Sequence, residues 1–246
     1  MQHPAAAPAP LVAAEAAADE DAGLSAFDEG VLDLFSHWYG GVPPDLRIES
    51  HGGMTGAKMV DAWRTLWFAK PPTQAGVDAA LRARFGPLLE GLDVSPGAPL
   101  PQPPPHLPPR GAMVWQLGVL ILLDQVTRNI YRGTARAYSG DALARRLVEG
   151  LMPSFDELPL PIRITLTLVF IHSEDAADVG RVEALLARMQ ASPAHSRYAE
   201  VWPSLCGIAG NHRDRMSLFG RVPERNALLH RASTEQELAY MEAMRA

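Results

Sequence analysis

Three short polar blocks in this sequence carry the residue types that acid–base chemistry and anion binding require. The first covers residues 124–138, where Asp124 and Arg128 lie four positions apart at the end of a strongly apolar stretch. Since positions i and i+4 share one face of a helix, this carboxylate and guanidinium can form an ion pair that closes the helix end. In the alternative interpretation, Arg128, Asn129 and Arg132 point into a cavity and hold an anion, a task for which the arginine fork is well suited.

The second block, residues 171–175, places His172 and Asp175 three positions apart at the end of another apolar run. One interpretation is a hydrogen-bond network that closes this helix end. Because histidine titrates near neutral pH, an acid–base or ligand-binding role for His172 and Asp175 is a second interpretation. Together with Glu174 and His212, these side chains could also ligate a hard or borderline metal ion. We expect neither a metal site nor a cofactor.

The third block, residues 211–231, contains five arginines, among them Arg221 and Arg225, with Asn226 beside the latter. Residues 124–136 carry a net charge of +2 and residues 211–231 carry +3, so the remainder of the chain carries −11. A neutral coding preference for arginine would not by itself segregate positive charge in this way. The segregation favours an anionic ligand or an acidic partner surface.

The composition of the chain narrows the class of protein. A formal net charge of −6 over 246 residues argues against a nucleic-acid partner and against a polybasic membrane-binding protein. The longest apolar runs, residues 112–123 and 164–171, are shorter than the roughly 20 residues that a membrane-spanning helix needs. Cys206 is the only cysteine, which excludes an intramolecular disulfide. We therefore expect a cytoplasmic protein that has neither nucleic acid nor a membrane as its partner.

Helical periodicity dominates the chain outside two proline-containing segments. Residues 1–26 are rich in alanine and proline and have almost no large apolar side chain, which predicts a disordered leader. Residues 93–109 include eight prolines, which predict a stiff insertion. No stretch shows the apolar–polar alternation typical of a strand, so we predict an all-α domain over residues 27–246. The expected helices, about nine in number, cover residues 27–38, 55–68, 74–92, 112–130, 139–151, 160–172, 178–190, 204–219 and 234–245.

The three blocks also carry a family resemblance. Residues 122–138 read LLDQVTRNIYRGTARAY, residues 172–175 read HSED, and residues 219–226 read FGRVPERN, followed by Arg231-Ala-Ser-Thr. In the same order, they resemble the motifs LLLDQFPRNIYRGTARAF, HSED and FGRFPHRN…GR-ST of the DUF924 family. The resemblance extends over roughly residues 27–246.

The chain departs from this family pattern at a few positions. Val126-Thr127 replaces the usual Phe-Pro, Glu224 replaces a histidine, and His230 stands where glycine is usual. The resemblance implies a fold similar to the TPR-like α-α superhelical proteins, in which antiparallel helix pairs stack. It implies no substrate. A mechanism that depended on the third-block histidine would lack that group here.

Our principal hypothesis is a TPR-like helical domain whose blocks converge on one arginine-rich pocket for a small anionic ligand or an acidic peptide. A second hypothesis is a protein-interaction scaffold that grips its partner on a concave face. A third is an enzyme that uses the same pocket, with His172 or Asp175 as the acid–base group and arginines stabilising negative charge. The side chains expected to line the pocket are Asp124, Arg128, Asn129, Arg132, His172, Asp175, Arg221, Arg225 and Asn226.

Overall fold

The computed structural model describes residues 23–50, 53–95 and 97–244, and every regular element in these ranges is a helix. The predicted all-α fold is therefore confirmed. Residues 1–22, most of the predicted leader, lie outside the described residues, and the superhelical arrangement implied by the resemblance stays a prediction. The α-helices are α1 (Ala26–Trp38), α2 (Ala57–Ala62), α3 (Thr73–Glu90), α4 (Pro109–Ile121), α5 (Thr127–Ile130), α6 (Asp141–Leu151), α7 (Leu160–Ile171), α8 (Ala176–Gln190), α9 (Trp202–Phe219) and α10 (Glu235–Ala243).

Two π-helical turns interrupt the regular α-geometry. One, Trp63–Trp67, follows α2, and the other, Leu122–Val126, joins α4 to α5. The single helix predicted over residues 112–130 is thus three consecutive elements, and it begins earlier, at Pro109. Proline is well tolerated at this first helical position because its missing N–H would have no partner there. A π turn carries one extra residue and is frequent at functional sites.

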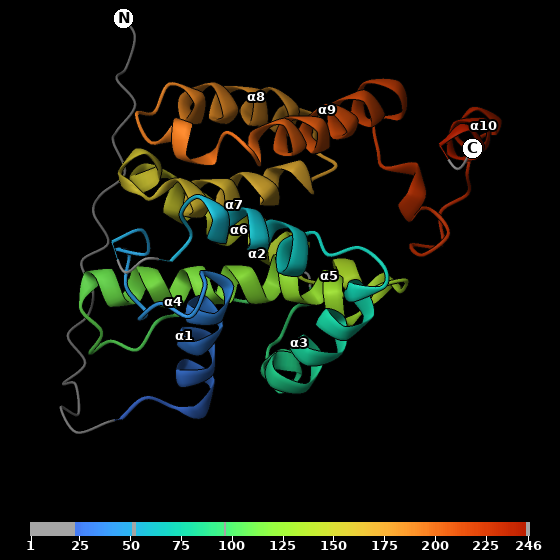
Figure 1. The fold of residues 1–246 in the computed structure, drawn as a ribbon. Helices are drawn as coiled ribbons and strands as arrows, with labels where there is room; N and C mark the ends of the chain where they lie inside the picture. The colour runs from blue at the N-terminus through green and yellow to red at the C-terminus, as the bar shows by residue number, and fades with distance from the viewer. Residues whose placement is uncertain (1–22, 51–52, 96, 245–246) are drawn as a thin grey trace, which may run out of the picture.

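The helices pack on both sides of a central rod made of α4, the second π turn and α5 (Figure 1). On one side of the rod, α1 packs against α4 and α3 packs against α5. On the other side lie α6, α7, α8 and α9, and each of these helices contacts the next. In addition, α9 contacts α7. The crossing of α1 and α4 is close because Gly118 has no side chain: a Cβ atom there would overlap the carbonyl oxygen of Val31. After α9 the chain turns back at the end of the molecule where α5 lies (Figure 1).

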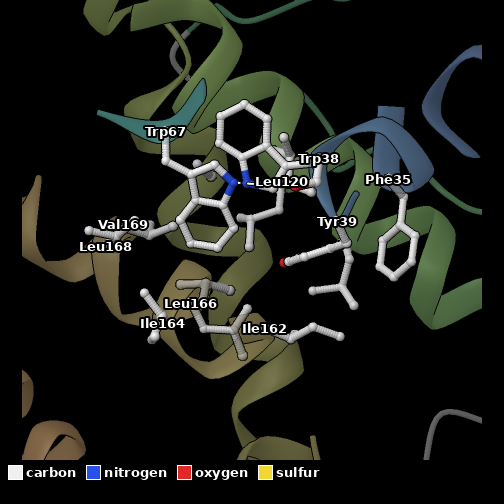
Figure 2. Packing of buried hydrophobic residues seen from close by; sticks show 14 of the residues in the cluster. Phe35, Trp38, Tyr39, Trp67, Leu120, Ile162, Ile164, Leu166, Leu168 and Val169 are labelled. Carbon is white, nitrogen blue, oxygen red and sulfur yellow. Dashed lines mark hydrogen bonds between the residues drawn. The ribbon is translucent and has the colours of Figure 1, made fainter. Parts of the chain in front are cut away.

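The core lies between α7 and aromatic side chains from α1 and the first π turn (Figure 2). Trp38 and Trp67 stack with their ring centroids 5.6 Å apart, and the Trp67 indole donates a hydrogen bond to the Trp38 carbonyl at 3.3 Å. The Tyr39 hydroxyl donates to Thr165 of α7 at 2.9 Å. The Trp67 indole and the Tyr39 hydroxyl are therefore buried with partners, whereas the buried indole nitrogen of Trp38 has none among the described residues. This packing holds α7 in a fixed position relative to the rod.

The last helix is attached at the end of α9. Phe219 lies edge-on against Tyr240 with ring centroids 5.1 Å apart. Thr234 and Glu237 form a capping box, in which each side chain accepts a hydrogen bond from the other residue's backbone N–H, at 3.2 Å and 2.7 Å. In the described part of the chain no helix has both the length and the apolar character needed to cross a bilayer.

Candidate functional site

The second π turn buries a carboxylate, that of Asp124, which is only 1% exposed. Gln125 donates a hydrogen bond to it at 2.5 Å, and Arg128, one turn later, donates to it at 3.1 Å. Arg128 also donates to the backbone carbonyl of Asp124 at 2.7 Å. A buried carboxylate needs such charged and hydrogen-bonded partners, because an unpaired one would carry a large desolvation cost.

The end of α7 meets this carboxylate directly. His172 follows the last residue of α7, and its Nδ1 atom lies 2.9 Å and 3.0 Å from the two carboxylate oxygens of Asp124. Burial alone would raise the pKa of Asp124, but the neighbouring His172 and Arg128 lower it below its ordinary value, so Asp124 is ionised. Burial, together with the charge of Arg128, lowers the pKa of His172. The first and second blocks therefore join through an ionised aspartate and a neutral histidine.

A second acid, Asp141, extends this network from the start of α6. Arg128 donates to it at 2.9 Å and so bridges the carboxylates of Asp124 and Asp141. Burial raises the pKa of Asp141 despite the nearby Arg128. The α6 start can approach the π turn because position 140 is glycine: a Cβ atom on Gly140 would overlap the carbonyl oxygen of Leu123.

The second and third blocks join through Glu174. Its carboxylate accepts hydrogen bonds from the backbone N–H of Val222 at 2.9 Å and from Arg231 at 2.5 Å and 3.0 Å. These bonds hold the chain after α9 against the end of α7. All three polar blocks thus meet at one place in the molecule.

The Arg225 guanidinium, unlike those of Arg128 and Arg231, has no hydrogen-bond partner among the described residues. Its side chain is 12% exposed, and its closest acidic oxygens, on Asp141 and Glu174, lie 3.8 Å and 3.9 Å away. Those separations exceed hydrogen-bond distance. The guanidinium lies over the ring of Tyr138, 4.8 Å from its centroid. Burial and the charge of Arg128 lower the pKa of Arg225.

A cavity of about 450 Å³ opens beside these groups. Its volume is that of a small-molecule site, for which about 300–1,000 Å³ is typical. The lining combines cationic, imidazole and apolar side chains drawn from all three blocks. It consists of Arg128, Arg132, Gly133, Ala137, Tyr138, Ile171, His172, Ile208, Asn211, His212, Arg215, Val222, Glu224 and Arg225.

Four of the residues expected from the sequence line this cavity: Arg128, Arg132, His172 and Arg225. Asp124 lies behind His172 and borders a second, smaller cavity of about 170 Å³ together with Asp141 and Glu174.

The other four expected residues have different roles. Asn129 accepts a hydrogen bond from Arg132 at 2.8 Å. Asp175 caps α8 by accepting from the N–H of Ala177 and forms an ion pair with Arg145, and it does not line the cavity. The remaining two, Arg221 and Asn226, donate hydrogen bonds to Glu237 instead of facing the cavity.

Sequence reasoning did not single out several residues that the structure brings to the site. Tyr138 ends the first block and Asp141 follows it, and their approach depends on the turn that leads into α6. Arg215 lies on α9 three residues after His212, which the sequence suggested only as a possible metal ligand, so one helix face presents both. Arg215 is paired with Glu224 at 2.7 Å.

His212 contributes a second imidazole to the cavity wall. It is 6% exposed, and its Nε2 atom has no hydrogen-bond partner within the part of the chain that the structure describes. Burial, Arg225 and His172 lower the pKa of His212 to about 4. Across the described ranges, no group of three or more histidine, cysteine, aspartate or glutamate side chains is arranged to hold a metal ion.

Comparison with known proteins places these blocks in a family. The model of the family described as bacterial protein of unknown function (DUF924) matches residues 35–244. A solved structure titled as a protein of unknown function, ATU0120 from Agrobacterium tumefaciens, is similar to this chain with 26% sequence identity and a TM-score of 0.52. That match covers 75% of this chain and 92% of the other. No curated protein matches the chain. The family match spans all three blocks and most of the sequence, and the chain belongs to the DUF924 family.

Proposed function

We propose that the cavity beside Arg225 binds a small anionic ligand. The observation that carries this proposal is the state of the Arg225 guanidinium, which is largely buried and hydrogen-bonded to no described residue. A buried cation without hydrogen bonds is costly, and an anion in the cavity would supply them. The planar guanidinium suits a carboxylate or a phosphoryl group equally well in shape.

The other arginines of the lining already have acidic partners. Arg132 donates to Asp78 at 2.8 Å, and Arg215 donates to Glu224 at 2.7 Å. Arg128 bridges two carboxylates, as described above. Arg225 has only the longer ion pairs with Asp141 and Glu174 and no hydrogen-bonded acid, and we take it as the anchor of the ligand's anionic group.

Apolar side chains on the same wall favour a ligand that has an apolar part as well. Ile171, Ile208 and Val222 line the cavity, and the ring of Tyr138 lies under the Arg225 guanidinium. The lining comes from the three blocks and not from side chains scattered along a concave helical face. This supports a ligand pocket over a peptide-gripping scaffold.

A thermal-shift experiment with inorganic phosphate, diphenyl phosphate and benzoate tests the proposal. We expect at least one of these anions to raise the melting temperature of the protein. Arg225→Gln should weaken its binding by about ten- to a hundredfold, which corresponds to the roughly 1.5–3 kcal/mol of a hydrogen bond to a charged group. Arg64→Gln is the matched control, because Arg64 is exposed and outside the cavity. If every anion changed the melting temperature of the wild type, Arg225→Gln and Arg64→Gln equally, the proposal would be disproved.

A further inference from the structure

We infer that the cavity is the active site of a hydrolase for small phosphodiesters, in which His172 activates the attacking water and Arg225 holds the phosphoryl group. This inference rests on the proposed anion site and adds a reaction to it. Its three supports are the charge available in the cavity, the orientation of the His172 ring and the proximity of the two groups.

The charge of the cavity favours a phosphodiester over a phosphomonoester. One guanidinium, that of Arg225, lacks a hydrogen-bonded acid, while Asp124, Asp141 and Glu174 lie close behind the wall. A phosphomonoester carries close to two negative charges at neutral pH, since its second pKa is near 6. A phosphodiester carries one charge, which matches the one lining guanidinium that has no hydrogen-bonded acid.

The contact with Asp124 sets the protonation pattern of the His172 ring. Because Nδ1 faces both carboxylate oxygens, the proton of the neutral ring resides on Nδ1. Nε2 then carries a lone pair, and within the described residues it makes no hydrogen bond. An aspartate behind a histidine orients the ring and stabilises the imidazolium that forms when Nε2 takes a proton.

Arg128 links the carboxylate beside His172 to a carboxylate beside Arg225. Arg128 contacts Asp124, the partner of His172, and also Asp141, which lies 3.8 Å from Arg225. His172 and Arg225 both line the 450 Å³ cavity. An anion held by Arg225 is thus presented to the wall that carries His172. Proximity of this kind lowers the barrier by supplying the orientation in advance.

The reaction consumes water and balances without another reactant. His172 Nε2 takes a proton from water as the water oxygen forms a bond to phosphorus. The bond from phosphorus to one ester oxygen breaks, and the departing oxygen receives the proton from His172. Arg225 and Arg128 oppose the negative charge on the phosphoryl oxygens during transfer. The products are a phosphomonoester and an alcohol.

Hydrolysis of bis(4-nitrophenyl) phosphate tests this inference, with 4-nitrophenyl phosphate and 4-nitrophenyl acetate as alternative substrates. We expect the wild-type protein to release nitrophenolate from the diester faster than from the monoester. His172→Gln, whose amide can still donate to Asp124, should lower the rate at least a hundredfold, within the usual contribution of a general base. His106→Gln, at an exposed loop position, is the matched control and should keep the full rate.

The binding experiment separates failure of the reaction from failure of the site. If an anion stabilises the protein through Arg225 but the diester is not hydrolysed, the hydrolase inference is wrong and the anion site stands. Equal diester rates in wild type and His172→Gln, or turnover of the acetate alone, would also overturn the inference. If no anion stabilises the wild-type protein, both the site and the reaction fail.

Discussion

The Nδ1 atom of His172 lies 2.9 Å and 3.0 Å from the two carboxylate oxygens of Asp124, a residue 48 positions earlier in the chain. This contact joins the end of α7 to the π turn of the central rod. Asp124 is buried and His172 is largely buried, and Arg128 completes the charge balance. These residues therefore serve both the stability of the fold and the proposed site, and substitutions can test the two roles separately.

Replacing Asp124 with asparagine should destabilise the fold. The substitution keeps the shape of the side chain but removes the charge that balances the largely buried Arg128, a loss that costs about 3–5 kcal/mol for a buried pair. Urea denaturation measures the free energy of unfolding. Asp33→Asn breaks an exposed pair with Arg84 and should change it by less than about 1 kcal/mol. Similar losses in the two variants would mean that the Asp124 network does not stabilise the fold.

Stability should decrease in mild acid because of the buried histidines. The folded protein holds the pKa of His212 at about 4, whereas the unfolded chain titrates near 6.5. As the pH falls below 6.5, His212 takes up a proton in the unfolded state before it does so in the folded state. The stabilisation that neutral His212 gives to the folded state is therefore present above pH 6.5 and is lost towards pH 4. One such group lowers the free energy of unfolding by up to about 1.4 kcal/mol per pH unit.

Comparison of denaturation at pH 7.5 and pH 5 checks this expectation. His212→Gln should reduce the pH dependence, while His106→Gln should leave it as in the wild type. His172, whose pKa is also lowered by burial, contributes the dependence that remains. An unchanged slope in His212→Gln would contradict the assignment.

Gly140, which precedes α6, and Gly150, within α6, form a matched pair for testing the position of the second π turn. Gly140→Ala would drive a Cβ atom into the carbonyl oxygen of Leu123, next to Asp124, and should lower the melting temperature and weaken anion binding. Gly150→Ala meets no atom within 4 Å and should stabilise the helix by about 0.5–1 kcal/mol. Thermal denaturation of both variants measures the difference. A stabilising Gly140→Ala would contradict the close approach of α6 to the turn.

The sequence was sufficient for the helical fold and for the local parts of the site. The i, i+4 spacing of Asp124 and Arg128 predicted a pair that the structure contains, because such a contact depends on helix geometry alone. The apolar run that became α7 likewise indicated a buried helix that ends at His172.

The remaining features depend on tertiary packing. Asp175 follows His172 closely in sequence, yet His172 caps the end of α7 and Asp175 caps the start of α8. Asp141 and His212 reach the site only because α6 and α9 pack around it. No periodicity distinguishes a π turn from the α-helix on either side of it, so the placement of Asp124 could not be derived.

The attachment of α10 should depend on Glu237. Its side chain accepts hydrogen bonds from Arg221 at 2.6 Å and from the N–H of Thr234 at 2.7 Å, and these bonds lower its pKa to about 2. Glu237→Gln should expose the segment between α9 and α10 to limited proteolysis at neutral pH. In the wild type, the stabilisation that ionised Glu237 gives to the attachment of α10 is complete when the pH is above the ordinary glutamate pKa. It is lost as the pH falls towards 2. Glu235→Gln, on the exposed side of α10, is the control, and equal cleavage of both variants would contradict the role of Glu237.

The most direct test of the anion site is anomalous diffraction from crystals soaked in perrhenate, a tetrahedral oxyanion with one negative charge. The Arg225 guanidinium lines the cavity and makes no hydrogen bond to a described residue, so it should hold this anion within hydrogen-bond distance. We expect a rhenium peak between Arg225 and the cavity wall that carries His172, and no such peak in crystals of Arg225→Gln. Rhenium bound only at exposed arginines outside the cavity, with Arg225 left without a ligand, would contradict the account.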